Sequence, residues 1–141
     1  MNFRPNISPK NELINSLQQN NSDFHCLIDI DSFCTFNRKH GFERGNEILS
    51  KIYDSLKRIV NPDSLAYLGS DEFYFSTDKN WSNPNSPVFY FMKSIKNELN
   101  ITVSIGITQN SKLKQPDEIM NLLKNNVLKA KSNGKNLIYC L

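Results

Sequence analysis

Apolar residues follow two different spacings along the chain, and these spacings divide its 141 residues into predicted strands and helices. Short runs rich in apolar or β-branched residues predict buried strands, whereas apolar residues three or four positions apart predict helices. Strands are predicted at residues 24–30, 101–108 and 136–141, with a hairpin at 64–77. Helices are predicted at residues 9–19, twice within 31–60 with a junction near Gly41, and at 86–99 and 115–134.

The order of these segments predicts an α+β fold with a mostly antiparallel five-stranded sheet flanked by helices, as in ferredoxin-like or palm domains. The connections are too short for every pair of strands to be joined by a parallel crossover. A chain of this length can bury a core without disulfides or a structural metal. We therefore expect one domain over residues 1–141, in which residues 1–22 form an N-terminal helical lead-in.

The composition narrows the classes of protein and partner. A hydrophobic content of 38% with 22% charged residues is typical of a globular protein. The net charge of +3 comes without a long block of Lys or Arg, so we expect phosphate-bearing small molecules as partners and no nucleic-acid polymer. The three cysteines lack C-x-x-C spacing, and no segment has the pattern of a signal peptide or a membrane span. These features predict a cytoplasmic protein without membrane contact.

Two acidic residues close the first predicted strand. Asp29 and Asp31 alternate with Ile30, so both carboxylates are expected on one face with the Ile30 carbonyl between them. Carboxylate and carbonyl oxygens at a strand end suit Mg²⁺, which leaves its other positions to water and substrate phosphate. The alternative is that Asp31 and Ser32 cap the following helix and Asp29 is a solvated charge.

A second acidic pair, Asp71 and Glu72, follows the predicted turn at Gly69 and Ser70. Charges beside a turn often serve only solubility. Two acidic clusters, one at a strand end and one at a hairpin tip, are also the sparse ligand set of palm enzymes that transfer nucleotidyl groups with metal ions. The combination favours the second interpretation.

Longer segments, in the same order and spacing, resemble GGDEF domains, the diguanylate cyclases. The segment LIDIDSFCTFNRKHGFERGNEIL (27–49) is similar to their D-x-D-x-F-K-x-x-N-D-x-x-G-H-x-x-G-D-x-x-L segment, and LGSDEF is similar to their signature hairpin. ITVSIGIT and AKSNGKN are similar to their T-V-S-I-G strand and their A-K-x-x-G-R-N ending. The resemblance implies a GGDEF-like sheet and a nucleotidyltransferase activity.

In that family two nucleoside triphosphates bind head to tail across a homodimer and are joined with the help of metal ions. The resemblance implies that Asp29, the Ile30 carbonyl and Asp71 hold Mg²⁺ or Mn²⁺. Glu72 would assist at the metal and at the attacking hydroxyl. Phosphate-binding positions are expected at Ser32, Phe33, Arg38, Lys131 and Lys135.

Several residues depart from the family pattern. Ser70 replaces the second signature glycine, and a positive φ there costs about 1 kcal/mol or somewhat more. Cys34 stands where the family has a phosphate-binding lysine, and Arg38 lies one helical turn later and is expected to replace it. Alternatively, Cys34 packs as a small apolar residue. Lys135 replaces an arginine, and Lys131 and Lys135 have a second interpretation as cations at a helix C-terminus.

The base-reading positions predict a change of substrate. Asn37 matches the family's asparagine, but Asn46 stands where the family has an aspartate. A carboxylate only accepts hydrogen bonds and suits guanine, whereas asparagine donates and accepts and matches adenine. Alternatively, Asn46 is an ordinary residue near a helix start.

The leading hypothesis is a metal-dependent nucleotidyltransferase that condenses two nucleoside triphosphates, ATP or GTP, into a cyclic dinucleotide second messenger. An adenine-containing product is slightly favoured over cyclic di-GMP, and the small size also resembles minimal CRISPR polymerases. The alternative is a catalytically inactive GGDEF-like module that binds nucleotide or a protein partner. Only Asp63 remains of the family's inhibitory Arg-x-x-Asp, so feedback inhibition by that route is not expected.

Overall fold

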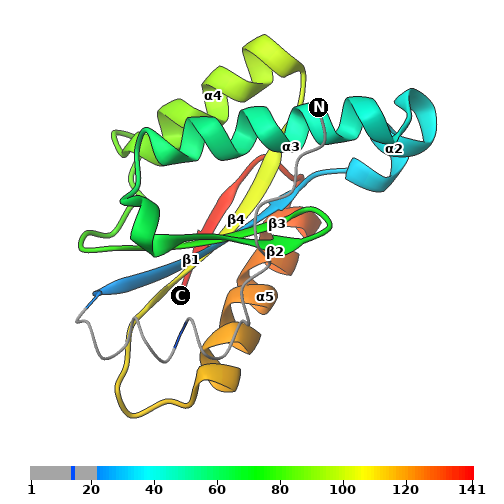
Figure 1. Cartoon of the computed structure of the whole chain (residues 1–141). Coiled ribbons are helices and arrows are strands. Elements are labelled where there is room, and N and C mark those ends of the chain that lie inside the picture. Colours follow the sequence, from blue (N-terminus) through cyan, green and yellow to red (C-terminus); the bar gives the residue numbers. More distant parts are fainter. Residues whose placement is uncertain (1–13, 15–21) are drawn as a thin grey trace.

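The computed structural model describes Ile14 and residues 22–141, which form a five-stranded sheet with helices on both faces (Figure 1). The helix predicted at 9–19 lies outside the described residues except for Ile14, which is helical and fully buried. The other predicted strands and helices are confirmed. They are β1 (Phe24–Ile30), α2 (Phe33–His40), α3 (Phe42–Lys57), the 3₁₀ turn η1 (Pro62–Ser64), β2 (Leu65–Gly69), β3 (Glu72–Thr77), α4 (Pro87–Leu99), β4 (Val103–Gln109), α5 (Pro116–Ser132) and β5 (Ile138–Cys140).

The sheet has the strand order β2-β3-β1-β4-β5, and β1 is its central strand. The β1–β3, β1–β4 and β2–β3 pairs are antiparallel, and only β4 and β5 run parallel. The predicted α+β class with a mostly antiparallel sheet is therefore confirmed. None of the helices in the described part of the chain is long and apolar enough to span a membrane.

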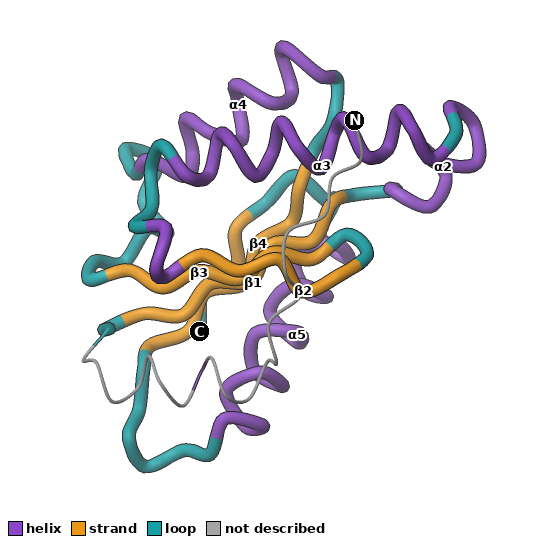
Figure 2. The backbone as a smooth tube through the Cα atoms, viewed as in Figure 1, coloured by secondary structure: helices purple, strands orange, loops and turns teal. Residues whose placement is uncertain are grey.

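Alternation along β1 separates two hydrophobic cores on opposite faces of the sheet. Cys26, Ile28 and Ile30 belong to the larger core, which packs against α3 and α4. Leu27 points the other way, into a smaller core with α5 residues such as Leu123. Figure 2 shows the strands as a layer between these two sets of helices. Because Asp29 alternates with Ile28 and Ile30, it lies on the α5 side of the sheet.

The junction between α2 and α3 depends on two glycines. Gly41 adopts a φ of 88°, which ends α2 and turns the chain into α3 as the sequence predicted. A Cβ atom on Gly45 would lie 1.9 Å from the side-chain oxygen of Asn37. Glycine at 45 therefore allows α3 to approach Asn37 of α2 closely.

The β2–β3 hairpin carries the turn that the sequence predicted. Gly69 has a φ of 98° and Ser70 has a φ of 52°, so the serine does adopt the positive φ expected of the glycine it replaces. The Tyr67 hydroxyl donates a hydrogen bond to the Ser70 carbonyl at 2.8 Å. This bond holds the turn in spite of a backbone strain of about 1 kcal/mol or more at Ser70.

A hydrogen-bonded network surrounds the fully buried His25 of β1. The His25 Nδ1 atom accepts from the Tyr74 hydroxyl, and Nε2 donates to the Asn110 side-chain oxygen at 2.9 Å. The Asn110 amide in turn donates to the Ser22 carbonyl at 2.6 Å. Burial lowers the pKa of His25 from its ordinary 6.5, although the Asn110 hydrogen bond acts in the opposite direction. The imidazole is therefore neutral in the folded protein.

We expect His25 to make folding sensitive to acid. Below about pH 6.5 the unfolded chain binds a proton on His25 that the folded protein does not, so the free energy of unfolding falls with decreasing pH. One proton contributes at most about 1.4 kcal/mol per pH unit. Urea unfolding between pH 7.5 and 5 measures this dependence in the wild type and in His25→Gln.

The second histidine of the chain, the exposed His40, offers a matched control. His40→Gln should retain the acid sensitivity of the wild type, whereas His25→Gln should lose part of it. The comparison between variants is needed because Asp29, described below, has a raised pKa and acts in the opposite direction. Equal pH dependence in all three proteins would disprove the assignment.

Candidate functional site

The two acidic clusters predicted from the sequence meet at one end of the sheet, where β1 ends and β3 begins. Asp29, near the end of β1, lies directly opposite Glu72 at the start of β3. The Ile30 amide donates to the Asp71 carbonyl at 3.0 Å, so the backbones of both segments are joined at this point. The antiparallel register therefore brings together carboxylates from segments about forty residues apart.

The Asp29 carboxylate lies in an environment that opposes its ionisation. Burial raises its pKa from 3.8 to about 6, and the negative charges of Asp71 and Glu72 act in the same direction. The hydrogen bond and charge of Lys131 oppose this rise. Carboxylates that repel each other in this way form a position where a cation is stabilised.

Lys131 occupies that cationic position. Its Nζ atom lies 2.7 Å from Asp29 Oδ1 and 3.4 Å from Asp31 Oδ1. Burial alone would lower the pKa of Lys131, but the two aspartates raise it above its ordinary value. Lys131 lies in the last turn of α5, as a helix-terminal cation would, yet its ammonium contacts the acidic cluster.

Asp31 anchors the strand end rather than capping α2. Its buried carboxylate accepts hydrogen bonds from the Thr102 and Ser104 hydroxyls, each at 2.7 Å, and from the backbone N–H of Asn136 at 3.0 Å. Ser32, the N-cap residue of α2, makes no capping hydrogen bond through its side chain. The helix-capping alternative for Asp31 and Ser32 is therefore wrong.

Sequence reasoning did not identify Thr102, Ser104 or Asn136 as partners of Asp31. Thr102 and Ser104 are two residues apart at the start of β4, so their hydroxyls lie on one face of the sheet, the face that also carries Asp31. That alternation was visible in the sequence. The pairing of β4 with β1, which brings these hydroxyls to Asp31, could not be predicted from the sequence.

Two of the predicted phosphate-binding residues also meet. The Lys135 ammonium donates to the Ser32 hydroxyl at 2.8 Å, although 103 residues separate them. Both line a 300 Å³ pocket beside Asp31. Lys135 and Asn136 adopt positive φ values of 65° and 53°, which turn the chain after α5 toward the strand ends. The segment after α5 thus places cationic and amide groups beside the acidic cluster.

A 400 Å³ pocket lies between α2, the start of α3 and the hairpin tip. Its walls are formed by Phe33, Cys34, Asn37, Arg38, Phe42, Ser70 and Asp71. Asn46, on α3, does not line it, and α3 begins at Phe42, so Asn46 lies beyond the first turn. The pocket joins a predicted base-reading residue, Asn37, to a predicted metal ligand, Asp71.

Cys34 and Arg38 form part of the same wall. Cys34 is exposed, so the alternative in which it packs as a small apolar residue is wrong. The Arg38 guanidinium lies 3.6 Å from the Cys34 sulfur, which confirms that α2 continues through Arg38 with both side chains on one face. Arg38 thus lies where a cation could replace the lysine that Cys34 displaces.

Asn37 carries an unusual polar group. Its side-chain oxygen is buried and has no hydrogen-bond partner among Ile14 and residues 22–141. A buried acceptor without a donor costs about 1–3 kcal/mol. Such groups are rare in folded proteins and are often found at functional sites. The close packing of Asn37 against Gly45 keeps this oxygen away from solvent.

The acidic cluster has the character of an open divalent site. Among the residues that the structure describes, no three His, Cys, Asp or Glu side chains are grouped so as to hold a metal ion by themselves. Mg²⁺ commonly uses only one or two carboxylates and completes its shell with water and substrate phosphates. The Lys131 ammonium, 2.7 Å from Asp29, is a cation already placed among these carboxylates. The residues present therefore fit a hard cation that a substrate helps to bind.

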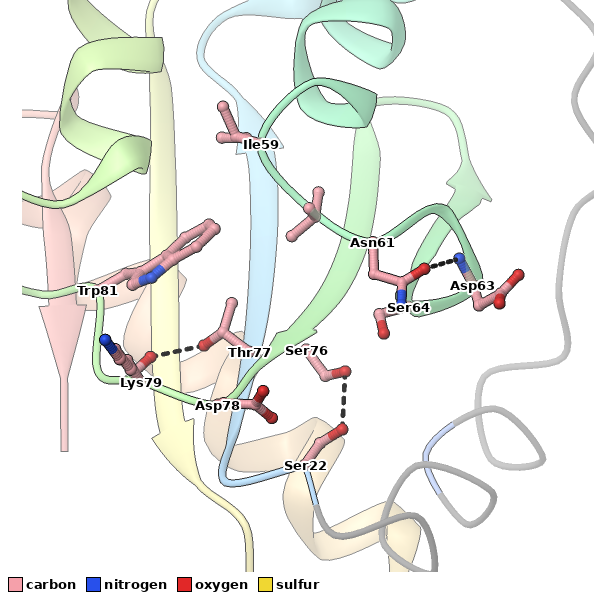
Figure 3. Close-up of a pocket in the computed structure, with 11 residues that line it drawn as sticks. Ser22, Ile59, Asn61, Asp63, Ser64, Ser76, Thr77, Asp78, Lys79 and Trp81 are labelled. Atoms are coloured by element: carbon pink, nitrogen blue, oxygen red, sulfur yellow. Dashed lines mark hydrogen bonds between the residues drawn. The ribbon is translucent and has the colours of Figure 1, made fainter.

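A second polar pocket, of 530 Å³, lies at the opposite end of β3, beside Thr77 (Figure 3). Its polar groups bond to one another: Thr77 donates to the Lys79 carbonyl and Ser76 to the Ser22 hydroxyl. Asp63, which lines it, is held by a backbone hydrogen bond to the Asn61 side chain. These satisfied groups give no indication of a ligand.

Solved structures share this fold at low sequence identity. The GGDEF domain of DgcB from Caulobacter crescentus, solved with c-di-GMP, matches with a TM-score of 0.74 and 18% identity over 93% of this chain and 85% of that one. The active GGEEF domain of a Vibrio cholerae diguanylate cyclase matches with a TM-score of 0.68 and 19% identity over 92% and 90%. Diguanylate cyclase SiaD from Pseudomonas aeruginosa, solved with its activator SiaC, matches with a TM-score of 0.77 and 17% identity. This match covers 92% of this chain and 54% of that one.

A comparison with curated protein sequences finds no match. The profile of the family described as diguanylate cyclase, GGDEF domain, matches residues 8–137, which is most of the chain. Together with the sheet order and the hairpin at Gly69, this match establishes the relationship that the motifs indicated. The chain belongs to the GGDEF domain family of diguanylate cyclases.

Proposed function

We propose that this protein is a metal-dependent nucleotidyltransferase that condenses two nucleoside triphosphates into a cyclic dinucleotide, with an adenine-containing product slightly favoured over cyclic di-GMP. The observation that carries the proposal is the proximity of Asp29, Asp71 and Glu72, with the Lys131 ammonium 2.7 Å from Asp29. A scaffold gains nothing from carboxylates that repel each other. A phosphoryl-transfer site needs them to hold the charge that neutralises a triphosphate.

Each residue of the cluster has a role that follows from its place. Asp29, the Ile30 carbonyl and Asp71 would hold Mg²⁺ or Mn²⁺, which when bound neutralises phosphate charge. Glu72, opposite Asp29, lies where it can accept the proton of an attacking hydroxyl. Phosphate-binding roles are proposed for the α2 N-terminus at Ser32 and Phe33 and for Arg38, Lys131 and Lys135.

The reaction requires two copies of the chain. A ribose hydroxyl of each nucleotide attacks the α-phosphorus of the other, a new P–O bond forms, and the bond to the β-phosphate breaks. Pyrophosphate leaves, and the hydroxyl proton passes to Glu72 or to water. Since one chain supplies one acidic cluster, two chains facing each other would hold the two nucleotides head to tail. A homodimer is therefore part of the proposal.

The preference for adenine rests on the side-chain amide of Asn46, because Asn37 matches the family pattern. An amide both donates and accepts, as the edge of adenine requires, whereas the aspartate of the family pattern accepts only. Asn46 lies one helical turn after Phe42, which lines the pocket, so a base extending beyond Phe42 would meet it. Asn37 itself lines the pocket, where its side-chain amide can contact a base.

The second candidate is a GGDEF-like module without catalytic activity that binds nucleotide or a protein. The strained Ser70 and the missing lysine at Cys34 favour it, because both alter a family position beside the phosphates. The ion pair of Lys131 with Asp29 also closes the cationic position in this state. The two candidates differ in whether pyrophosphate and a dinucleotide are formed.

Loss of Asp71 should abolish product formation. The protein is incubated with ATP, GTP or both, with Mg²⁺ or Mn²⁺, and products are identified by mass spectrometry. A metal-holding carboxylate is worth several kcal/mol of transition-state stabilisation, so Asp71→Asn should lower the rate at least about a hundredfold. Asp78→Asn, an exposed aspartate at the other end of β3, should retain the wild-type rate. A wild type that forms no dinucleotide under any of these conditions supports the inactive module.

Loss of Lys131 should destabilise the metal-free protein. In Lys131→Met the carboxylates repel without a counter-ion, and we expect a loss of about 1–2 kcal/mol in unfolding free energy at pH 8. Millimolar Mg²⁺ should raise the melting temperature of this variant more than that of the wild type, because the ion replaces the ammonium. Lys124→Met removes an exposed cation from the same helix and should change neither value. A Lys131→Met protein as stable as the wild type without metal would disprove the counter-ion role.

Asn46→Asp should shift base use toward guanine. One well-formed pair of hydrogen bonds contributes about 1–3 kcal/mol of discrimination, so the ratio of GTP to ATP incorporation should rise about tenfold. Product composition in an equimolar mixture measures the ratio. Asn121→Asp, which adds the same charge on the exposed face of α5, is the control. An unchanged ratio in Asn46→Asp would remove the argument for adenine while leaving the nucleotidyltransferase proposal intact.

A further inference from the structure

Phe42 is a large apolar side chain that is exposed at the candidate site instead of being packed in the core. Phe42 is the first residue of α3 and is 79% exposed. It lines the 400 Å³ pocket together with Asn37 and Asp71. Tyr90, another exposed aromatic residue, lines a separate pocket that contains no carboxylate. Phe42 is thus the exposed aromatic ring in contact with the acidic site.

The backbone that carries Phe42 is held against α2. The Gly41 amide donates to the Asn37 carbonyl at 2.8 Å, and the Gly45 amide donates to the Gly41 carbonyl at 3.1 Å. The close approach of Gly45 to Asn37 ties α3 to α2 in addition. The ring therefore projects from a corner whose backbone is hydrogen-bonded on both sides, and a preorganised backbone favours one orientation of a bound ligand.

We infer that Phe42 stacks on the purine base of the bound nucleoside triphosphate. The inference rests on the proposed function and assigns base affinity and base selectivity to different residues. Stacking on an aromatic ring is largely insensitive to which base is stacked, because every base has a π-face. Phe42 then supplies affinity for a base, whereas the amides of Asn37 and Asn46 choose between adenine and guanine.

The layout of the pocket favours a base over other occupants. Asp71 marks the end at which the triphosphate would lie, while the remaining walls offer a buried ring, Phe33, an exposed ring, Phe42, and the Asn37 amide. Cys34, Arg38 and Ser70 complete the walls. A mostly apolar cavity with a few hydrogen-bonding groups is how proteins commonly bind a flat heterocycle. Figure 1 shows the α2–α3 corner extending past the tip of the β2–β3 hairpin, on the side away from the sheet. A base directed away from Asp71 toward this corner would meet Phe42.

The experiment separates base binding from phosphate binding. Affinities are measured by calorimetry, with Mg²⁺, for α,β-methylene analogues of ATP and GTP, which cannot react, and for inorganic tripolyphosphate. Phe42→Ala should weaken both nucleotide analogues by a similar factor, about tenfold, and leave tripolyphosphate binding unchanged. Phe42→Tyr should restore nucleotide affinity, and Phe42→Leu should restore only part of it. Tyr90→Ala, which removes an exposed ring from α4, should change none of these affinities.

A spectroscopic measurement tests the stacking directly. Trp81, the only tryptophan, lines the other pocket and packs against Phe75, so Trp81→Phe provides a background without tryptophan. Adding Phe42→Trp then places a single indole at the pocket. The ATP analogue should quench its fluorescence with the same affinity that calorimetry gives, and tripolyphosphate should leave the fluorescence unchanged.

The outcomes distinguish this inference from the function on which it rests. A wild type that binds neither analogue overturns both. A wild type that binds them, with Phe42→Ala binding equally well, overturns the stacking role alone. Equal weakening of tripolyphosphate and the nucleotides would show that Phe42 supports the site structurally. A change in oligomeric state on gel filtration without a change in nucleotide affinity would show that the ring is covered by a second copy of the chain, and would overturn the stacking role as well.

Discussion

The site depends on the antiparallel register that places Asp29 opposite Glu72. Like charges directly opposite each other destabilise a sheet. Here a third carboxylate, Asp71, adjoins the pair, and burial makes the repulsion stronger. The fold tolerates the arrangement because Lys131 extends from the end of α5 into the cluster. The position of α5, and of the core that holds it, is therefore tied to the charge at the end of β1.

The rest of the site is held by strained backbone around that ion pair. In the described part of the chain five non-glycine residues have a positive φ, and four of them lie at the candidate site: Ser32, Ser70, Lys135 and Asn136. Each such conformation costs of order 1 kcal/mol or more and persists only where neighbouring contacts enforce it. Those contacts are present, since Asn136 donates to Asp31, Lys135 to Ser32, and Tyr67 to the Ser70 carbonyl. Concentration of strain at one end of a sheet is typical of a functional site.

Much of the fold could be predicted from the sequence because its information is local. The alternation in residues 24–30, the spacing of apolar residues in 42–57 and the glycines at 41 and 69 each act over a few positions. The order of the segments then left few sheet arrangements. The predicted D-I-D geometry also held, since Lys131 contacts both aspartates from one side.

What the sequence could not provide were contacts decided by packing. The role of Asp31 depends on Thr102 and Ser104, which meet it only when β4 pairs with β1. Local propensity made helix capping the equally reasonable use of Asp31. The exposure of Cys34 and Phe42 likewise depends on how α2 and α3 meet and on which side of that corner faces the hairpin. Neither follows from the pattern of apolar residues, which would place a phenylalanine inside.

Departures from the family pattern occur at both ends of the site. The acidic end rests on β1, β3 and the end of α5, where Asp29, Asp71 and Lys131 match the pattern and the neighbouring Ser70 and Lys135 depart from it. The pocket end rests on the α2–α3 corner, where Cys34 and Asn46 also depart from it. The corner meets the hairpin tip at Ser70 and Asp71. The register of the carboxylates is set by the pairing of β1 with β3, in which the corner takes no part. In the proposed function the carboxylates hold the metal and the corner carries the base-reading amides, so a substitution at the corner can alter the base preference without moving the carboxylates.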